Sequence, residues 1–327
     1  MILIHSDHLD FSTAEVIKWL LHAGKKVTRI NGPDIVYRGD MIGNIEELTL
    51  NDFTIEINGK KIKYSEIEQY WYRRGMFNME VKLKKDKSVI RAKTADYLLS
   101  EKKAILGFIE LLLAAKATVC DFFRADVNKL VVLREARRAG LKTPDTVITQ
   151  NTEVLKRFRK KNNGAVITKV IDKNIVLNTG QYWMPMYTAA ITDTHVKKLG
   201  RSFFPGIFQQ QVKKKYELRI FYLCGEMYSM AIFSQTNRKT RTDFRRYDMK
   251  KPNRQVPFNL PEEIAGKLTR LMQRLNLDTG SIDMMVDERD DYYFLEVNPV
   301  GQFGMTSYPC NYQLEKKIAA ILATNTA

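Results

Sequence analysis

The sequence predicts a mixed α/β protein with several domains, and three observations support this. Residues 1–30 follow the order strand, loop, helix, strand, and the middle of the chain alternates helices with apolar strands. Near the end, two apolar strands flank a polar turn at residues 287–291, which is typical of a β-hairpin. With 327 residues, of which 44% are hydrophobic and 28% charged, the chain is long enough for two or three domains with substantial cores.

The opening strand–helix–strand unit is typical of Rossmann-type α/β layers, with Gly24 ending its helix. Residues 5–8 lack the glycine-rich phosphate fingerprint, so we expect the nucleotide site elsewhere. Asn58 and Gly59 predict a two-residue hairpin turn. A long helix is expected over residues 93–115, and we place the first domain boundary at residue 120.

The remainder of the chain is expected to form a small middle domain, residues 121–205, and a last domain, residues 206–327. An apolar strand that contains one lysine is expected at residues 165–170 of the middle domain. The elements expected in the last domain are strands at 207–212, 217–223 and 227–233, a helix at 262–275, the hairpin, and a closing helix at 312–322.

The net charge of +16 favours an anionic partner, but composition alone does not choose among nucleotides, nucleic acids, membranes and acidic peptides. No recognisable nucleic-acid module accompanies the charge. No apolar run is long enough to span a bilayer, and the opening MILIHSD lacks the basic head and apolar body of a signal peptide. Three widely spaced cysteines predict reduced thiols in a cytoplasmic protein, and the spacing of His and Cys argues against a zinc site.

Acidic and amide side chains interrupt the apolar strands of the hairpin. Asp283 lies in the first strand, and Glu296 and Asn298 lie two residues apart in the second, so the latter two share a face. Acids inside apolar strands destabilise the fold unless something binds them. Such hard oxygen ligands suit Mg²⁺, which usually shares them with substrate phosphates. The alternative is a solvated hairpin with incidental charges; we favour the metal site.

Two lysines of the middle domain stand out. Lys129 opens an expected helix, and Lys169 lies in the apolar strand, where a charge needs an anion beside it. Facing two acids that hold Mg²⁺, they would clamp a triphosphate from both sides. In so basic a chain, surface lysines explain each position equally well.

The segment Gln210, Gln211 and Val212 is a polar break between two strands, suited to a linker whose backbone hydrogen-bonds an adenine edge. Glu217 then lies at ribose distance, and Arg219 shares its strand face. An ordinary basic turn is the alternative explanation.

Residues 236–248 form a loop that is too basic for a core and too long for a tight turn. Phosphoryl transfer requires cations at the moving phosphate, and guanidinium fits phosphate and acyl-phosphate oxygens best. We expect Arg245 or Arg246 to serve this role, whereas Arg238 and Arg241 fit a solvated loop better.

The order of these parts resembles the ATP-grasp superfamily over nearly the whole chain. The resemblance implies a Rossmann-like pre-ATP-grasp domain, a central lid domain, and a C-terminal domain that binds nucleotide and metal. It implies that Lys129 and Lys169 bind ATP, that residues 210–212 bind adenine and Glu217 ribose, and that the Asp283, Glu296 and Asn298 set binds Mg²⁺. One departure is Gln210, where many members have an acid; backbone recognition of adenine survives that change.

The segments KKYELRIFYLCGEMYSMAIFSQ and FLEVNPVGQFGMTSYPCNY resemble the grasp-with-spasm peptide maturases, relatives of the microviridin and graspetide ligases. This resemblance implies ATP with Mg²⁺, two ions being usual, and an acidic ribosomal precursor peptide with a leader segment. Asp or Glu carboxylates of that peptide would be phosphorylated and then attacked by Thr or Ser hydroxyls or Lys amines. Homodimers are usual among these relatives.

Two other functions stay open at this point. One is an ATP-dependent carboxylate–amine ligase that adds an amino acid to a peptide or small molecule, similar to the ribosomal-protein glutamate ligases or glutathione synthetase. The other is a non-catalytic nucleotide- or peptide-binding protein. The metal residues, both lysines and the basic loop occur together in this chain, which argues against the second.

Overall fold

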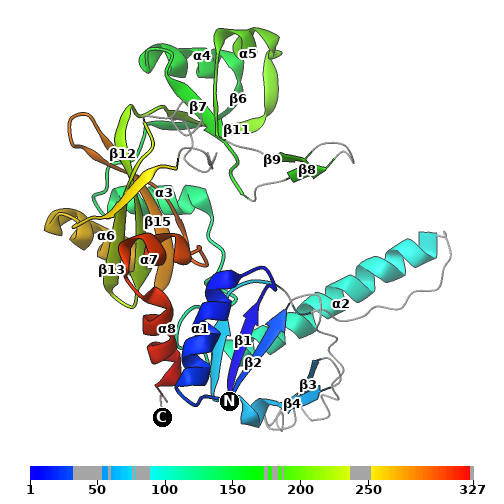
Figure 1. Ribbon diagram of the computed structural model, residues 1–327. Helices are drawn as coiled ribbons and strands as arrows, with labels where there is room; N and C mark the ends of the chain where they lie inside the picture. Colours follow the sequence, from blue (N-terminus) through cyan, green and yellow to red (C-terminus); the bar gives the residue numbers. More distant parts are fainter. Residues whose placement is uncertain are drawn as a thin grey trace. The chain divides into compact units, whose positions relative to one another are not determined.

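The computed structural model describes residues 1–31, 54–57, 60–75, 77, 89–172, 176–178, 183–185, 188–235 and 252–324 (Figure 1). The chain divides into two compact units. The first contains residues 1–126, 302–307 and 312–327, and the second contains residues 127–301 and 308–311. A further division of the second unit at residue 205 stays a prediction.

The first unit is built on a parallel sheet with the order β2-β1-β5. Its strands are β1 (Ile2–Ser6), β2 (Val27–Asn31) and β5 (Gln69–Tyr72). Helix α1 (Phe11–His22) connects β1 to β2 and ends just before Gly24, whose φ is +72°. Helix α8 (Leu314–Ala323), from the end of the chain, packs along α1.

Three further elements complete the first unit. β3 (Thr54–Ile57) and β4 (Lys60–Lys63) pair as the hairpin predicted around residues 58–59, which themselves lie outside the described residues. A short 3₁₀ helix follows (Tyr64–Glu66). The predicted long helix is α2 (Val89–Ala114). No helix in the described part of the chain, α2 included, is long and apolar enough to cross a lipid bilayer.

A buried polar cluster lies where β1 and β5 end. Asp10 caps α1 by accepting the Thr13 N–H, and its Oδ2 lies 3.6 Å from the Nε atoms of both Arg73 and Arg74. The Arg73 guanidinium also lies over the ring of Phe303, 5.1 Å from its centroid. Residues from three distant parts of the sequence therefore hold this end of the sheet together.

The second unit begins with an antiparallel sheet of order β10-β7-β11-β6. Its strands are β6 (Thr146–Asn151), β7 (Val166–Lys169), β10 (Ala189–Ala190) and β11 (Ser202–Gln210). Helices α4 (Thr152–Lys161) and α5 (Asp193–Lys198) cover one face of this sheet. Leu155 of α4 and Val196 of α5 form a buried cluster there with Phe208 of β11. A separate antiparallel pair is formed by β8 (Val176–Asn178) and β9 (Trp183–Pro185).

A five-stranded antiparallel sheet of order β14-β13-β12-β15-β16 completes the second unit. Its strands are β12 (Lys214–Leu223), β13 (Glu226–Phe233), β14 (Arg254–Pro257), β15 (Thr279–Asp287) and β16 (Tyr292–Asn298). The predicted acidic hairpin is thus β15–β16.

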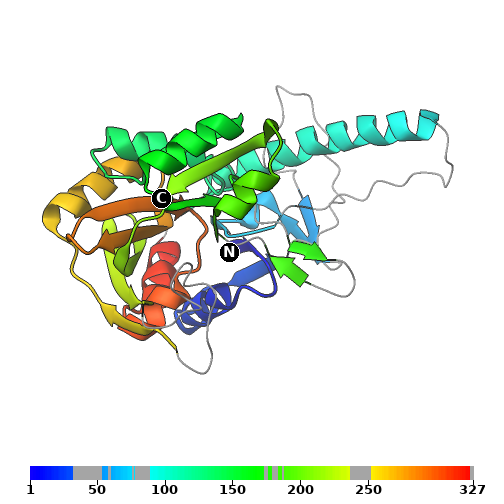
Figure 2. The same cartoon turned by 90° about the horizontal axis from the view of Figure 1, so that it is seen from above.

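One face of this sheet packs on helices α3 (Lys129–Arg138) and α6 (Glu262–Arg274), which Figure 2 shows from above. Leu218, Ile220 and Met284 point into that core. Because strand side chains alternate, Glu217, Arg219 and Asp283 lie on the opposite face. A short helix, α7 (Gly304–Cys310), follows the hairpin.

Candidate functional site

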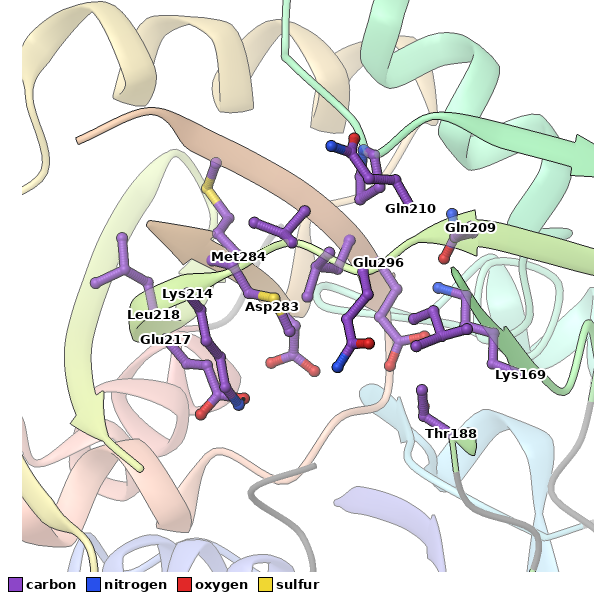
Figure 3. A pocket seen from close by; sticks show the side chains of 16 residues that line it. Lys169, Thr188, Gln209, Gln210, Lys214, Glu217, Leu218, Asp283, Met284 and Glu296 are labelled. Carbon is purple, nitrogen blue, oxygen red and sulfur yellow. Dashed lines mark hydrogen bonds and ion pairs between the residues drawn. The ribbon is translucent and has the colours of Figure 1, made fainter. Parts of the chain in front are cut away.

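A pocket in the second unit lies between the two sheets, and Figure 3 shows the side chains that line it. β7, β11, the linker after β11, β12, β15 and β16 all contribute to its wall. The lining residues are Pro144, Ile167, Lys169, Thr188, Gln209, Gln210, Gln211, Val212, Lys214, Glu217, Leu218, Asp283, Met284, Met285, Leu295 and Glu296. Much of the wall is apolar, with two lysines and three acids inside it.

The two predicted metal acids face each other on adjacent strands. Asp283 of β15 is the direct partner of Glu296 in β16, and Ser281 is the partner of Asn298. The register shifts between Asp283 and Met284, so Leu295 is an extra residue in β16, a β-bulge. Directly opposed residues in an antiparallel pair share a face, so both carboxylates and the amide lie on one face.

Asn298 is held by the turn that follows it. Its Oδ1 accepts the Val300 N–H at 3.2 Å, and its carbonyl accepts the Gly301 N–H at 3.0 Å. Gly301 lies so close to Ser281 that a Cβ atom there would be 2.4 Å from the serine Cβ and Oγ. The turn is therefore fixed against β15, and with it the position of Asn298.

Arg219 extends the acid pair to a third strand. It is the β12 partner of Asp283, and its Nη1 donates to both carboxylate oxygens at 2.7 and 2.9 Å. The side chains of Arg219 and Asp283 are 12% and 16% exposed, so this ion pair is largely shielded from water. Arg219, Asp283 and Glu296 thus form a continuous row across three strands.

These residues fit Mg²⁺ by the chemistry of their donor atoms. Within the described residues, no three imidazole, thiol or carboxylate side chains gather at one point. Asp283, Glu296 and Asn298 offer two carboxylates and one amide. Mg²⁺ is typically held by one or two carboxylates, with waters and substrate phosphates completing the octahedron.

Lys169 lies at the end of β7, opposite Ile207 of β11, and lines the pocket. The sequence predicted a buried strand here, whereas only Val166 of β7 is buried and Lys169 is half-buried. The strand lies beside the pocket rather than inside a core. A half-buried lysine in the pocket wall remains well suited to an anionic ligand.

The predicted adenine linker leads from β11 into β12. The Gln209 side chain donates to Thr146 Oγ1, and Gln210 Oε1 accepts the Asp145 N–H, so both side chains already have partners. The Gln211 N–H donates to the Ala165 carbonyl at 2.9 Å. Among the described residues none accepts from the Val212 N–H, which leaves this group to meet a ligand edge.

Glu217 is buried and has two close partners. Lys214 Nζ lies 2.7 Å from Oε1, and Ser234 Oγ donates to Oε2 at 2.6 Å. Burial raises the pKa of Glu217, and the Lys214 ammonium and the Ser234 hydroxyl oppose this effect. The sequence analysis missed both Lys214, which lines the pocket, and Ser234, which holds Glu217 from outside the lining. The run Lys213–Lys215 gave no sign of which lysine turns inward.

The solved structures most like this chain cover it almost completely. It is 28% identical to macrocyclase MdnC of Microcystis aeruginosa MRC, bound with precursor peptide MdnA, covering 100% of both chains with a TM-score of 0.79. It is 26% identical to the RiPP-associated ATP-grasp ligase of Chryseobacterium gregarium, in complex with ADP and a leader and core peptide. That match covers 98% of this chain and 95% of the other, with a TM-score of 0.78.

The chain has the ATP-grasp fold. At 12% identity, D-alanyl-alanine synthetase A of Vibrio cholerae shares the fold alone, with a TM-score of 0.61 over 99% and 97% of the chains. No family model and no curated protein matches the sequence. The resemblance found in the sequence is confirmed, as is the α/β fold class.

The pocket lining includes neither Arg219 nor Asn298, which adjoin its two acids, and three further predicted residues are not placed in it. Lys129 opens α3, and its Nζ donates to the Asp172 carbonyl at 3.0 Å; the pocket lining does not include it. Its role toward ATP stays a prediction. Arg245 and Arg246 lie outside the described residues, so their role as phosphate ligands also stays a prediction.

Proposed function

We propose that this protein is an ADP-forming ATP-grasp ligase that closes ω-ester or ω-amide crosslinks within a ribosomally made precursor peptide. The bonds join Asp or Glu side chains to Thr or Ser hydroxyls, or to Lys amines, of the same peptide. The observation that carries the proposal is the row of Arg219, Asp283 and Glu296, whose two acids line a pocket in a fold shared end to end with peptide-bound ATP-grasp enzymes.

The reaction has two balanced steps. A peptide carboxylate attacks the γ-phosphorus of ATP, which gives an acyl phosphate and ADP. A hydroxyl or amine of the same peptide then attacks the acyl carbon, loses its proton, and releases phosphate. The peptide loses one water for each crosslink. Attack within one peptide gains from proximity, because the reacting groups share a chain.

The residues of the pocket suit the first step. Lys169 in the pocket wall and Arg219, which is bonded to Asp283, supply positive charge for the phosphates of ATP. Asp283, Glu296 and Asn298 would hold Mg²⁺, which neutralises the charge that develops on the phosphate oxygens. We assign the Val212 N–H to the adenine and Glu217 to the ribose.

The partner that we propose is an acidic peptide with a leader segment. MdnC and the Chryseobacterium gregarium ligase are both bound to peptides. A net charge of +16 would attract an acid-rich chain over long range and speed encounter. We further propose a homodimer, on the family resemblance alone; light scattering of the purified protein tests this.

The first experiment measures the intact mass of the short acidic peptide encoded beside this gene after incubation with the protein and Mg-ATP. Loss of one or more waters together with ADP release is the expected result. Mild base then separates esters, which hydrolyse, from amides. The Glu296→Gln variant is the matched control, because it removes a metal carboxylate at almost constant volume.

The other outcomes separate the alternatives. A gain in peptide mass with ADP release would replace the proposal with an amino-acid ligase. An unchanged peptide without ADP release, from a protein that binds no Mg-ATP in calorimetry, would contradict the proposed function.

A further inference from the structure

Lys214 lines the pocket but is not among the residues proposed to bind Mg²⁺, phosphate or adenine. The Lys214 and Glu217 side chains are 3% and 5% exposed, and their charged atoms lie 2.7 Å apart. Both line the pocket, where Figure 3 shows them side by side. Lysine is almost never fully buried without a partner, because removing its ammonium from water is costly.

A bulge in β12 turns Lys214 inward. In a regular strand, Lys214 and Glu217 are three residues apart and would point to opposite faces. The observed pairing places Lys214 opposite Asp287 and Tyr216 opposite Val286, so Lys215 is an extra residue. This moves the Lys214 side chain to the face of Glu217. Bulges are common beside functional sites because they redirect a side chain in this way.

The neighbouring lysines lie in different surroundings. Lys213 and Lys215 are 83% and 50% exposed and pair with Glu288 and Asp290 in the polar turn of the hairpin. Of these three consecutive lysines, Lys214 is the one that lines the pocket. The two exposed lysines therefore make matched controls for the buried one.

The Lys214–Glu217 pair has the donors and acceptors that a hydroxyl requires. An ammonium has three N–H donors and no acceptor, and a carboxylate accepts only. Among the described residues, Glu217 is the hydrogen-bond partner of Lys214, so donors remain for a ligand. A hydroxyl that donates to Glu217 and accepts from Lys214 would satisfy both groups together.

We propose that Lys214 is a nucleotide-binding residue that, with Glu217, recognises a ribose hydroxyl of ATP. The ribose hydroxyl donates to the carboxylate of Glu217 and accepts from the ammonium of Lys214. This assignment rests on the proposed function. It goes beyond that function by naming a second ribose ligand and by predicting discrimination against deoxynucleotides.

The test is calorimetric binding of Mg-ATP, Mg-2′-deoxyATP and Mg-3′-deoxyATP to the full chain. The wild-type protein is expected to prefer ATP over at least one deoxynucleotide. Lys214→Met should weaken ATP binding by about 10- to 100-fold, the range for losing a hydrogen bond to a charged group. It should weaken binding of the discriminated deoxynucleotide far less, so the preference disappears. Lys213→Met should leave both affinities unchanged.

The pH profile provides a second readout. Three groups surround the Glu217 carboxylate. Lys214 comes from the same strand and the Ser234 hydroxyl from just after β13, and the charge of Asp283 in β15 raises the pKa of Glu217. Lys214→Met removes the cation that contacts Glu217 directly, while Arg219 of the same strand stays bonded to Asp283, so Glu217 protonates at higher pH. ATP affinity of the variant should therefore fall on acidification at a higher pH than in the wild type.

Two results would overturn the inference. Lys214→Met would bind ATP as the wild type and Lys213→Met do, or it would lose affinity for ATP and for the deoxynucleotides by the same factor. Should the single variant not fold, Lys214→Met/Glu217→Met removes both charges together, which buried pairs usually tolerate. That variant must bind ATP and deoxynucleotide alike. A wild-type protein that binds no Mg-ATP would overturn this inference together with the proposed function.

Discussion

Gly301→Ala tests how tightly the hairpin fixes the metal residues. A Cβ at Gly301 would lie 2.4 Å from Ser281 Cβ and Oγ and 3.1 Å from the Asn298 carbonyl oxygen. Rotating the serine moves its Oγ but not its Cβ, so the turn must shift by about 1 Å to reach an ordinary contact. Overpacking of this kind destabilises by about 1–3 kcal/mol. At about 2–4 °C per kcal/mol, the melting temperature should fall by about 2–12 °C.

The same shift should weaken Mg-ATP binding, because Asn298 is held by the turn and Mg²⁺ demands near-ideal geometry. Scanning calorimetry and titration with Mg-ATP measure the two effects. Gly266→Ala in α6 is the control, since its Cβ would meet only Arg270 Nη1 at 3.8 Å and alanine favours a helix. Wild-type melting temperature and ATP affinity in Gly301→Ala would refute the reasoning.

Three further predictions concern charged side chains. Asp283→Asn should abolish ADP release because it removes a metal carboxylate at constant volume, and it should also lower the melting temperature because Arg219 loses its ion-pair partner; normal turnover would refute the metal assignment. Lys169→Ala should weaken ATP binding, as calorimetry would detect, and unchanged affinity would make the lysine structural. Burial raises the pKa of Asp10, but Arg73 and Arg74 lower it more, so the net shift is downward. The stabilisation is present at neutral pH and is lost as pH falls below about 3.8 through the lowered pKa. In urea unfolding, Asp10→Asn should cost about 3 kcal/mol at pH 7 and progressively less as the pH falls below about 3.8; a cost that does not change with pH would contradict this.

The chemistry of the hairpin was predictable because it depends on local sequence. Alternation of apolar residues located both strands, and the acids within them indicated a metal site before any coordinates. The register that opposes Asp283 to Glu296 includes a bulge at Leu295, which no local pattern announces. The ion pair of Asp283 with Arg219 depends on β12 lying beside β15, 64 residues apart in sequence.

Sequence reasoning did not identify Lys214 as a pocket residue. Strand periodicity places it on the face opposite Glu217, and only the extra residue at Lys215 reverses this. Lys169 was expected in a buried strand because apolar residues precede it, but only Val166 packs into a core, whereas Ile167 borders the pocket. Asp10 caps α1, and its burial with two arginines depends on β5, about sixty residues later.

The first unit is built from segments at both ends of the sequence, which has a consequence for folding during synthesis. Its sheet and α1 come from the beginning of the sequence, whereas Phe303 and α8 come from the end. Leu314, Ile318 and Leu322 of α8 are buried, so α1 exposes an apolar face until they arrive. A ribosome would therefore release the second unit complete while the first still waits for its last helix. Removing residues 312–327 should unfold the beginning of the protein before its middle.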